Sequence, residues 1–307
     1  MNKIAICYGA LRSGTTVLRL MLNQHSHLTC PGESDFLVDH LTVRPDGQVH
    51  LDKDSLARYR FFADMNIPLP RSEGREALAE MLQALNPDPD KVLVLMLHRG
   101  ICQLHGLFPE MSVIHFVRDP RDVARSSIGM GWAGNVYWGV DHWQRTETEW
   151  DAFEALGRRA DLEMRYEALI HDPRATLQDM LSALGLQWQD AMLEYDSQTT
   201  YEKPSTDLVD QWRRKQTPRE IGLVEGRIGA LLQARGYAPS GHPVIVPGAF
   251  GRFLLWASSR RFVWGNKFQR YGVRDSVLDF MARRLGMRRL ARKLADRFSE
   301  IDAQHVK

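Results

Sequence analysis

The chain has 307 residues, of which 44% are hydrophobic and 25% charged, values that are ordinary for a folded globular protein. Its formal net charge of +2 argues against a polyanionic partner such as nucleic acid, and its three cysteines argue against a disulfide framework. The sequence contains no uninterrupted apolar run of about 18 residues, so no transmembrane helix is predicted. We therefore expect a cytoplasmic protein without a signal peptide, with one sizeable core and some additions.

The first predicted elements are a strand, a turn and a helix. An apolar run from Ile4 predicts a buried strand, and a turn through Gly9 and Gly14 leads into a helical pattern. Unpaired amides and the positive end of the helix dipole would point at this turn, which suits an anion. The spacing approaches the phosphate-binding loop G-x-x-x-x-G-K-[ST], but Thr15 replaces the lysine and the fixed charge lies at Arg12. An ordinary tight turn is the alternative.

The dipeptide Pro31-Gly32 predicts a turn that presents Glu33 soon after the first helix. A glutamate near an anion site is able to remove a proton from an incoming hydroxyl, so Glu33 is a candidate general base. The alternative is a solvated loop carboxylate, or a cap for the segment 36–41.

The uninterrupted apolar run 92–97 predicts a central parallel strand. His98 and Arg99 follow at its carboxyl end, where ligands of open α/β sheets bind, so either is a candidate source of positive charge. Solvent-facing side chains at a strand end are the alternative. The preceding insertion, 43–90, contains a predicted helix at 75–85 and no recognisable motif.

A second central strand is predicted at 112–117, and a helix at 121–128 with Pro120 at its start. Arg118 lies between them, and its planar guanidinium is suited to bind two phosphate oxygens at once. His115 alternates with apolar neighbours, which favours a packed strand histidine over a catalytic one.

The next predicted elements are helical, apart from one short strand. Tryptophans 138, 143 and 150 favour core packing over an acceptor pocket for a ring or sugar. We expect a strand and turn at 161–169, a helix at 173–184 closed by Gly185, and a helix from the cap Thr217 to Ala234.

Residues 243–307 combine aromatic and basic side chains and are predicted to form a helical extension. Basic amphipathic helices with interfacial tryptophans bind anionic membranes, which predicts a peripheral membrane contact. An extra helical layer packed on the core is the commoner explanation, and a homo-oligomer contact is a further alternative.

Two segments together resemble the sulfotransferases that use 3′-phosphoadenosine 5′-phosphosulfate (PAPS). The residues Arg12-Ser13-Gly14-Thr15-Thr16 resemble the 5′-phosphosulfate loop of that family. The pattern F-P-x-x-x-x-I-H-x-V-R-D-P-R-D-V-x-x-S, from Phe108 to Ser126, resembles its second PAPS signature. The resemblance covers about 3–237 and is closest in motif to the tyrosylprotein and bacterial enzymes. It implies a three-layer α/β/α fold with a central parallel sheet and a P-loop-like nucleotide site.

The resemblance also implies a role for individual residues. Arg118 and Ser126, eight positions apart, match the pair that holds the 3′-phosphate, Tyr166 matches a tyrosine near the adenine, and Ser205 matches a serine in a late loop that covers the nucleotide. Glu33 matches the glutamate of a Gly-Glu pair that acts as the catalytic base. His98 is the second candidate, because the cytosolic small-molecule enzymes use a histidine. His98 and Arg99 replace the Lys-x-Pro motif of many relatives, whose lysine helps to stabilise the sulfonate.

The implied reaction is sulfonate transfer from PAPS, without a metal, to a hydroxyl or amine of a small-molecule, glycan, lipid or peptide acceptor. Residues 1–242 would form the sulfotransferase-like domain and 243–307 the extension. Two alternatives remain. One is a P-loop kinase, against which Thr15 and the lack of a convincing magnesium-binding carboxylate argue. The other is a non-catalytic nucleotide-binding protein on the same scaffold, which the missing lysine keeps open.

Overall fold

The computed structural model describes residues 3–44, 46–195 and 205–305 of the chain. Its main sheet has five strands in the order β2-β5-β1-β6-β7, and every pair is parallel. These strands are β1 (Ile4–Tyr8), β2 (Leu28–Thr29), β5 (Val92–Leu97), β6 (Ser112–Val117) and β7 (Leu162–Arg165). The predicted parallel sheet is therefore confirmed, and its three central strands coincide with the three apolar runs of the sequence.

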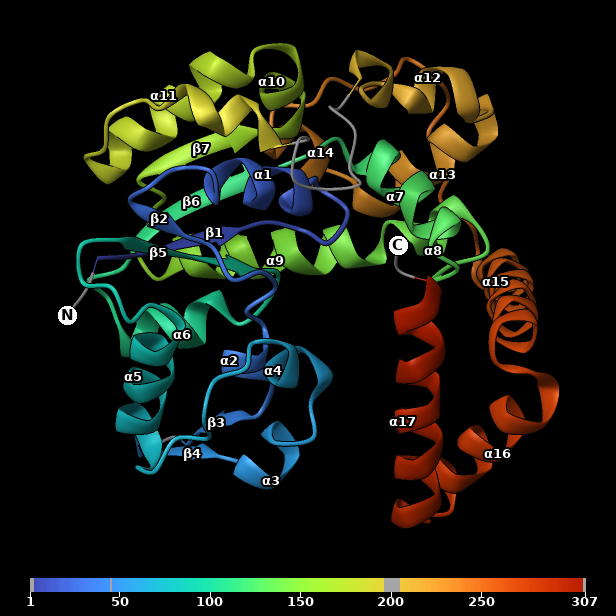
Figure 1. Cartoon of the computed structure of the whole chain (residues 1–307). Coiled ribbons are helices and arrows are strands. Elements are labelled where there is room, and N and C mark those ends of the chain that lie inside the picture. Colours follow the sequence, from blue (N-terminus) through green and yellow to red (C-terminus); the bar gives the residue numbers. More distant parts are fainter. Residues whose placement is uncertain (1–2, 45, 196–204, 306–307) are drawn as a thin grey trace.

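Helices cover both faces of this sheet, which gives the predicted three-layer α/β/α fold (Figure 1). One face packs against α1 (Thr15–Leu22), α10 (Tyr166–His171) and α11 (Pro173–Leu184). The other packs against α5 (Gly74–Leu85), α6 (Ile101–Leu107) and α9 (Asp141–Ala155). Because both faces are covered, β1 and β5 are buried along their whole length, as a central parallel strand requires.

The segment between β2 and α5 forms a small lobe beside the sheet. It holds α2 (Phe36–Asp39), the hairpin β3 (Leu41–Val43) and β4 (Val49–Leu51), α3 (Lys53–Leu56) and α4 (Arg60–Asp64).

His115 on β6 of the main sheet is packed as expected, because its ring stacks on Trp150 with the centroids 3.9 Å apart.

Further helices lie past the carboxyl ends of β6 and β7. They are α7 (Pro120–Gly129), α8 (Val136–Gly139), α12 (Gln211–Lys215), α13 (Pro218–Ile228) and α14 (Leu231–Ala234), with a short 3-10 turn at Thr206–Leu208. A second 3-10 turn, Asp190–Leu193, follows α11 and packs against α1. The expectation of one helix from Thr217 to Ala234 is wrong, because Gly229 breaks it with a positive φ of 56°. The turn expected after the strand near 162 is instead the helix α10.

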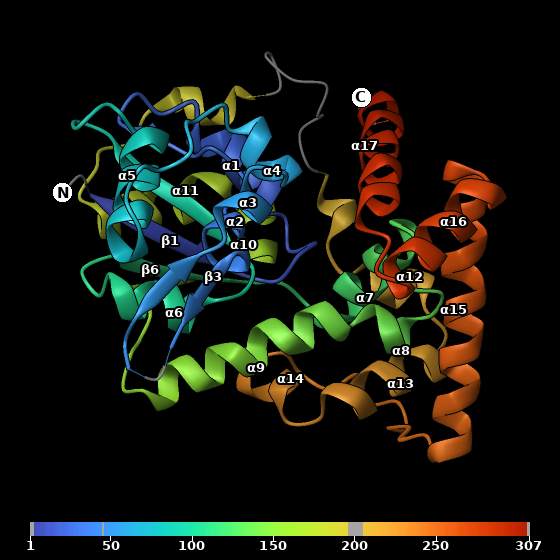
Figure 2. The same cartoon turned by 90° about the horizontal axis from the view of Figure 1, so that it is seen from below.

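The C-terminal extension is helical, as predicted, and consists of α15 (Ala249–Tyr271), α16 (Val273–Arg284) and α17 (Arg288–His305). Figure 2 shows α15 running along one side of the molecule, with α16 and α17 folded back beside it. The left-handed Gly286 lies between α16 and α17. None of the helices within the described residues is long and apolar enough to cross a membrane.

Candidate active site

The candidate site residues follow the strands of the main sheet at its carboxyl edge. The Arg12 loop follows β1, Glu33 follows β2, His98 follows β5, Arg118 follows β6 and Tyr166 follows β7. Because the carboxyl ends of parallel strands share one edge, segments far apart in the sequence meet there. The parallel bridge between Glu33 and Met96 continues this arrangement beyond β2.

The loop between β1 and α1 needs glycine at two positions. A Cβ atom on Gly9 would lie 2.1 Å from the backbone oxygen of Phe116, so only glycine lets the loop pass over β6. Gly14 has a φ of 93°, and a Cβ there would lie 2.3 Å from the ring of Tyr166. Gly14 is also the N-cap of α1 and offers no side chain to cap it, so the first amides of the helix are available to an anion.

Arg118 is held beside this loop by its guanidinium. Its two terminal nitrogens donate hydrogen bonds of 3.0 Å to the backbone oxygens of Arg12 and Leu208. The guanidinium also stacks on the ring of Tyr166, 4.0 Å from its centroid. Its buried Nε has no hydrogen-bond partner among the described residues, so one directed donor is left over.

Arg12 and Ser126 are joined by a hydrogen bond of 3.0 Å from Nε to Oγ. Ser126 lies on α7, the helix that follows Arg118. The Arg12 loop and the segment from Phe108 to Ser126, the two signatures recognised in the sequence, are therefore in direct contact. Arg12, Arg118, Ser126 and Tyr166 therefore form one cluster around the start of α1.

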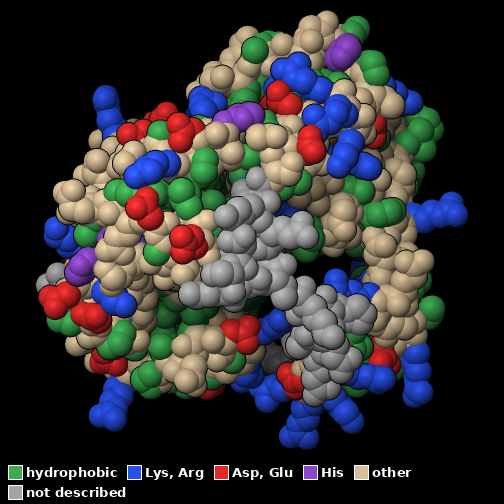
Figure 3. Space-filling view, turned by 45° about the horizontal axis from the view of Figure 1, so that its top comes forward, with side chains coloured by type: hydrophobic (Ala, Val, Ile, Leu, Met, Phe, Trp, Pro, Cys, Tyr) green, Lys and Arg blue, Asp and Glu red, His purple; other side chains and the backbone are tan. Residues whose placement is uncertain are grey.

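This cluster opens into a cavity of about 1270 Å³. Figure 3 shows a hollow near the middle of the molecule with Lys and Arg side chains at its margin. The predicted site residues that line the cavity are Arg12, Gly14, Thr15, Thr16, Glu33, Arg118, Ser126 and Tyr166. A single cavity thus contains most of the residues that the sequence assigned to donor binding and to base catalysis.

Glu33 is a half-buried member of that lining. Across the described part of the chain, no hydrogen bond or ion pair engages its carboxylate. A carboxylate that faces the cavity without a partner is available to accept a proton.

His98 has a different environment from Glu33. It is buried, and its Nδ1 lies 2.6 Å from the backbone oxygen of Gly9. Because a carbonyl oxygen only accepts, Nδ1 carries the proton and donates it to this bond. His98 is not among the residues that line the cavity. His98 therefore lies outside the cavity and supports the loop between β1 and α1 through its hydrogen bond to Gly9.

Arg99 is paired with two carboxylates, at 3.0 Å from Asp35 and 2.5 Å from Asp39. The hydrogen bonds that Arg99 donates to Asp39 are the main cause that raises the pKa of the Arg99 guanidinium above its ordinary value. Arg99 does not line the cavity, so the structure gives no support to it as a replacement for the lysine of the family motif.

Two further predicted residues lie outside the lining. Ser13 is fully buried within the loop, and its Oγ has no partner in the described ranges. Ser205 is exposed, and its Oγ accepts a hydrogen bond of 3.1 Å from the amide of Asp207. The first residue of the predicted covering loop, 204, lies outside the described residues, but Leu208, Gln211 and Lys215 from the same region do line the cavity.

One wall of the cavity comes from α15, which the sequence did not reveal as part of the site. Phe262, Asn266, Lys267, Arg270 and Tyr271 all contribute to the lining. Close approach between α15 and the segment before α8 depends on Gly134, where a Cβ would lie 2.6 Å from that of Phe262. The glycines at 131 and 134, where a Cβ would meet Asn266 and Phe262 of α15, are a sequence signal of this close approach.

The cavity is strongly positive. Its lining carries seven cationic side chains against the two carboxylates Glu33 and Asp122; the cations are Arg12, Arg60, Arg118, Arg125, Lys215, Lys267 and Arg270. Burial raises the pKa of Asp122 from 3.8 to about 6, although the nearby Arg118 opposes this effect. Such a lining suits a ligand with several negative charges. In the described ranges, no group of three or more His, Cys, Asp or Glu residues is arranged to hold a metal ion.

Comparison with protein families and curated proteins gives a consistent result. The family model described as "Sulfotransferase family" matches residues 5–190. Protein-tyrosine sulfotransferase 2 of Gallus gallus is 23% identical over 267 residues, which cover 76% of this chain and 69% of that protein. The family match includes Glu33, Arg118 and Tyr166, and it ends before Ser205 and α15.

Two solved structures share the fold. The sulfotransferase domain from the curacin biosynthetic pathway has a TM-score of 0.55 and 15% identity, with 78% of this chain and 99% of that domain covered. The sulfotransferase domain from the olefin synthase of Synechococcus PCC 7002 has a TM-score of 0.52 and 20% identity, with 73% and 94% covered.

Proposed function

The chain belongs to the sulfotransferase family, and from that premise we propose that it transfers the sulfonate of PAPS to a hydroxyl or amine of an acceptor. As a member of this family it is an enzyme, which removes the alternative of a non-catalytic binding protein. The observation that carries the proposal is the cluster of Arg12, Arg118, Ser126 and Tyr166 at the start of α1, inside one positive cavity.

The residues of the cavity fit PAPS as a donor. The uncapped start of α1 suits the 5′-phosphate and its sulfonate, beside Arg12. Arg118, with its free Nε, and Ser126 would hold the 3′-phosphate, since a guanidinium donates charge-assisted hydrogen bonds to phosphate oxygens. Tyr166, which packs between Gly14 and Arg118, would lie beside the adenine.

PAPS supplies the sulfonate, which passes to the acceptor oxygen or nitrogen as the bond to the 5′-phosphate oxygen breaks and 3′-phosphoadenosine 5′-phosphate (PAP) leaves. Glu33 removes the proton of the acceptor, because its carboxylate faces the cavity and has no competing partner in the described residues. Arg12 and the amides at the start of α1 stabilise the charge that develops on the phosphate oxygen. The position of His98 behind the loop makes it a positioning residue in this proposal.

The acceptor would bind beside Glu33, with α15 as a further wall of the same cavity. The α15 wall combines the aromatic side chains Phe262 and Tyr271 with the polar Asn266 and the cation Lys267. Lys267 forms an ion pair of 2.8 Å with Asp279, so it is held in place by α16.

Calorimetric titration tests the donor assignment directly. PAP should bind, and ADP with magnesium, which lacks the 3′-phosphate, should bind much more weakly. Binding of ADP that depends on magnesium would favour the kinase alternative, and equal binding of both nucleotides without magnesium would argue against the role of Arg118 and Ser126.

A further inference from the structure

Two helices of the C-terminal extension, α15 and α16, bury polar or small side chains and expose apolar ones. The buried residues of α16 are Ser276, Asp279 and Ala282, and the buried residue of α15 is Ser259. Their large apolar side chains are mostly exposed instead; Phe250 retains 75% of its accessible surface and Val273 60%. A helix packed on a core normally shows the opposite pattern.

The exposed apolar side chains are concentrated in this region. Of twenty large hydrophobic side chains that are exposed among the described residues, thirteen lie between 244 and 287, a small part of the chain. On α16, Val273, Val277, Phe280 and Met281 are spaced i, i+4, i+7 and i+8, so they form one stripe along the helix. An apolar surface of this kind indicates an interaction site.

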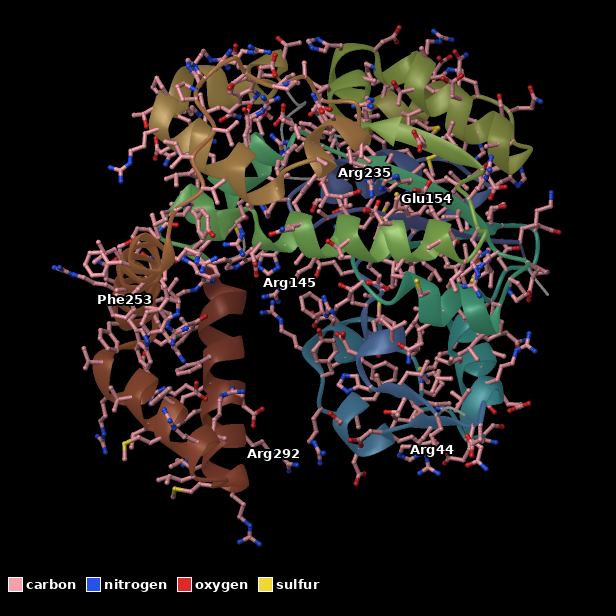
Figure 4. The ribbon with its side chains drawn as sticks, turned by 180° about the vertical axis from the view of Figure 1, so that it is seen from behind. Arg44, Arg145, Glu154, Arg235, Phe253 and Arg292 are labelled. Carbon is pink, nitrogen blue, oxygen red and sulfur yellow. The ribbon has the colours of Figure 1, made fainter. Side chains whose placement is uncertain are left out.

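The exposed apolar side chains of α15 adjoin the stripe on α16. The ring of Trp264 on α15 contacts the ring of Phe280 on α16, with the centroids 5.4 Å apart. Towards the start of α15 the surface continues with Phe253, which Figure 4 places at the outer edge of the molecule. We name this surface the α15–α16 face and define it by Phe250, Phe253, Leu254, Val277, Phe280 and Met281.

Positive charge surrounds the α15–α16 face. Residues 243–274 contain no Asp or Glu and six Lys or Arg residues, of which Lys267 and Arg270 line the cavity instead. Arg252, Arg260 and Arg261 are exposed along α15. The two carboxylates of α16 are already paired, Asp279 with Lys267 and Arg283, and Asp275 with Arg297. The face is therefore apolar in its centre and cationic at its margin.

We propose that the α15–α16 face docks on a lipid bilayer that contains anionic headgroups. Apolar side chains would enter the interface between headgroups and acyl chains while the arginines contact the headgroups, as in helices that lie on membranes. A second copy of the chain is a poorer occupant, because a two-fold contact would bring this cationic margin against itself. Since the opposite side of α15 lines the cavity, docking would hold the acceptor wall near the membrane.

The test is sedimentation of the full-length protein with vesicles of phosphatidylcholine, with or without phosphatidylglycerol. The protein should sediment with the phosphatidylglycerol vesicles, and less at high salt, because salt screens the charges. Arg260→Gln with Arg261→Gln should weaken the partition coefficient about 30-fold. Phe250→Ser, Phe253→Ser and Leu254→Ser together should weaken it at least about tenfold.

Variants at exposed residues away from the α15–α16 face serve as controls. Arg44→Gln with Arg58→Gln removes the same charge from exposed residues of the small lobe, where Figure 4 labels Arg44, and should leave the partition unchanged. Leu69→Ser in the small lobe with Leu156→Ser at the end of α9 removes exposed apolar side chains away from the face and should also leave the partition unchanged. Circular dichroism checks that all variants fold.

Absence of sedimentation with phosphatidylglycerol vesicles would overturn the proposal. Equal loss in the control variants would overturn it too, because binding would then reflect overall charge. Analytical ultracentrifugation without vesicles completes the test: a dimer that the Phe250, Phe253 and Leu254 variant dissociates would assign the face to a second copy instead.

Discussion

Arg12 and Ser126 lie 114 positions apart in the sequence, and a 3.0 Å hydrogen bond joins Nε of the first to Oγ of the second. The bond connects the loop after β1 to helix α7, so the two ends of the proposed donor site are fixed relative to each other. Arg118 strengthens this connection, because it donates to the backbone oxygen of Arg12. Recognition of the two phosphate groups is therefore expected to be coupled.

Arg118→Ala should raise the dissociation constant for PAP about 10- to 100-fold, because one or two charge-assisted hydrogen bonds to phosphate are lost. Arg118→Lys should give an intermediate value, since an ammonium keeps the charge but loses the planar fork. Calorimetry measures both, with ADP as the control ligand that lacks the 3′-phosphate. An unchanged affinity for PAP would remove Arg118 from the donor site.

Glu33→Gln should lower turnover about 10²- to 10⁴-fold, because an amide does not accept the acceptor proton. The affinity for PAP should change little, since Glu33 is not among the groups assigned to the nucleotide. Turnover is followed as release of PAP from PAPS, with an acceptor found by screening phenols, sugars and lipid headgroups. Normal turnover in this variant would exclude Glu33 as the base.

His98→Asn separates a positioning role from a catalytic one. The amide of asparagine takes the place of Nδ1 and is able to donate to the oxygen of Gly9, so loop geometry and most of the turnover should be retained. His98→Ala should weaken PAP binding and turnover together, because the support of the loop is lost. If His98 were the base, both variants would lose turnover to a similar extent while PAP binding remained normal.

Gly14→Ala should destabilise the protein by about 1 to 3 kcal/mol and weaken PAP binding, because the positive φ and the Tyr166 ring both exclude a Cβ. Gly265→Ala is the matched control. It lies inside α15 with nothing within 4 Å of the added atom, so it should stabilise the helix by up to about 1 kcal/mol. Thermal unfolding compares the two, and a neutral Gly14→Ala variant would contradict the tight packing of the loop.

Asp122 should make stability depend on pH. Its pKa is about 6 in the folded state, mainly through burial, and its ordinary value is 3.8. Between these values the folded state binds more protons than the unfolded state, so stability falls as pH rises. Relative to Asp122→Asn, the wild-type protein should lose up to about 3 kcal/mol of unfolding free energy between pH 4 and pH 7. Denaturant unfolding at several pH values measures it, and parallel pH profiles of the two proteins would refute the raised pKa.

Local pattern in the sequence was sufficient for much of this architecture. The apolar runs at 4–8, 92–97 and 112–117 became the central strands, since an unbroken apolar strand is stable only when both of its faces are covered. Glycines and prolines marked the turns between them. The spacing from Arg118 to Ser126 was already visible, because it depends on one strand end and the helix that follows it.

Tertiary packing decided the rest, because it depends on contacts between segments that carry no local signal of each other. The pairing of Arg99 with Asp35 and Asp39 removed a candidate that looked equivalent to His98 in the sequence. His98 faces the oxygen of Gly9 because β5 and β1 are neighbours in the sheet. The side of α15 that lines the cavity was fixed by its contact with Gly134, and the outward direction of its aromatic side chains followed from that contact.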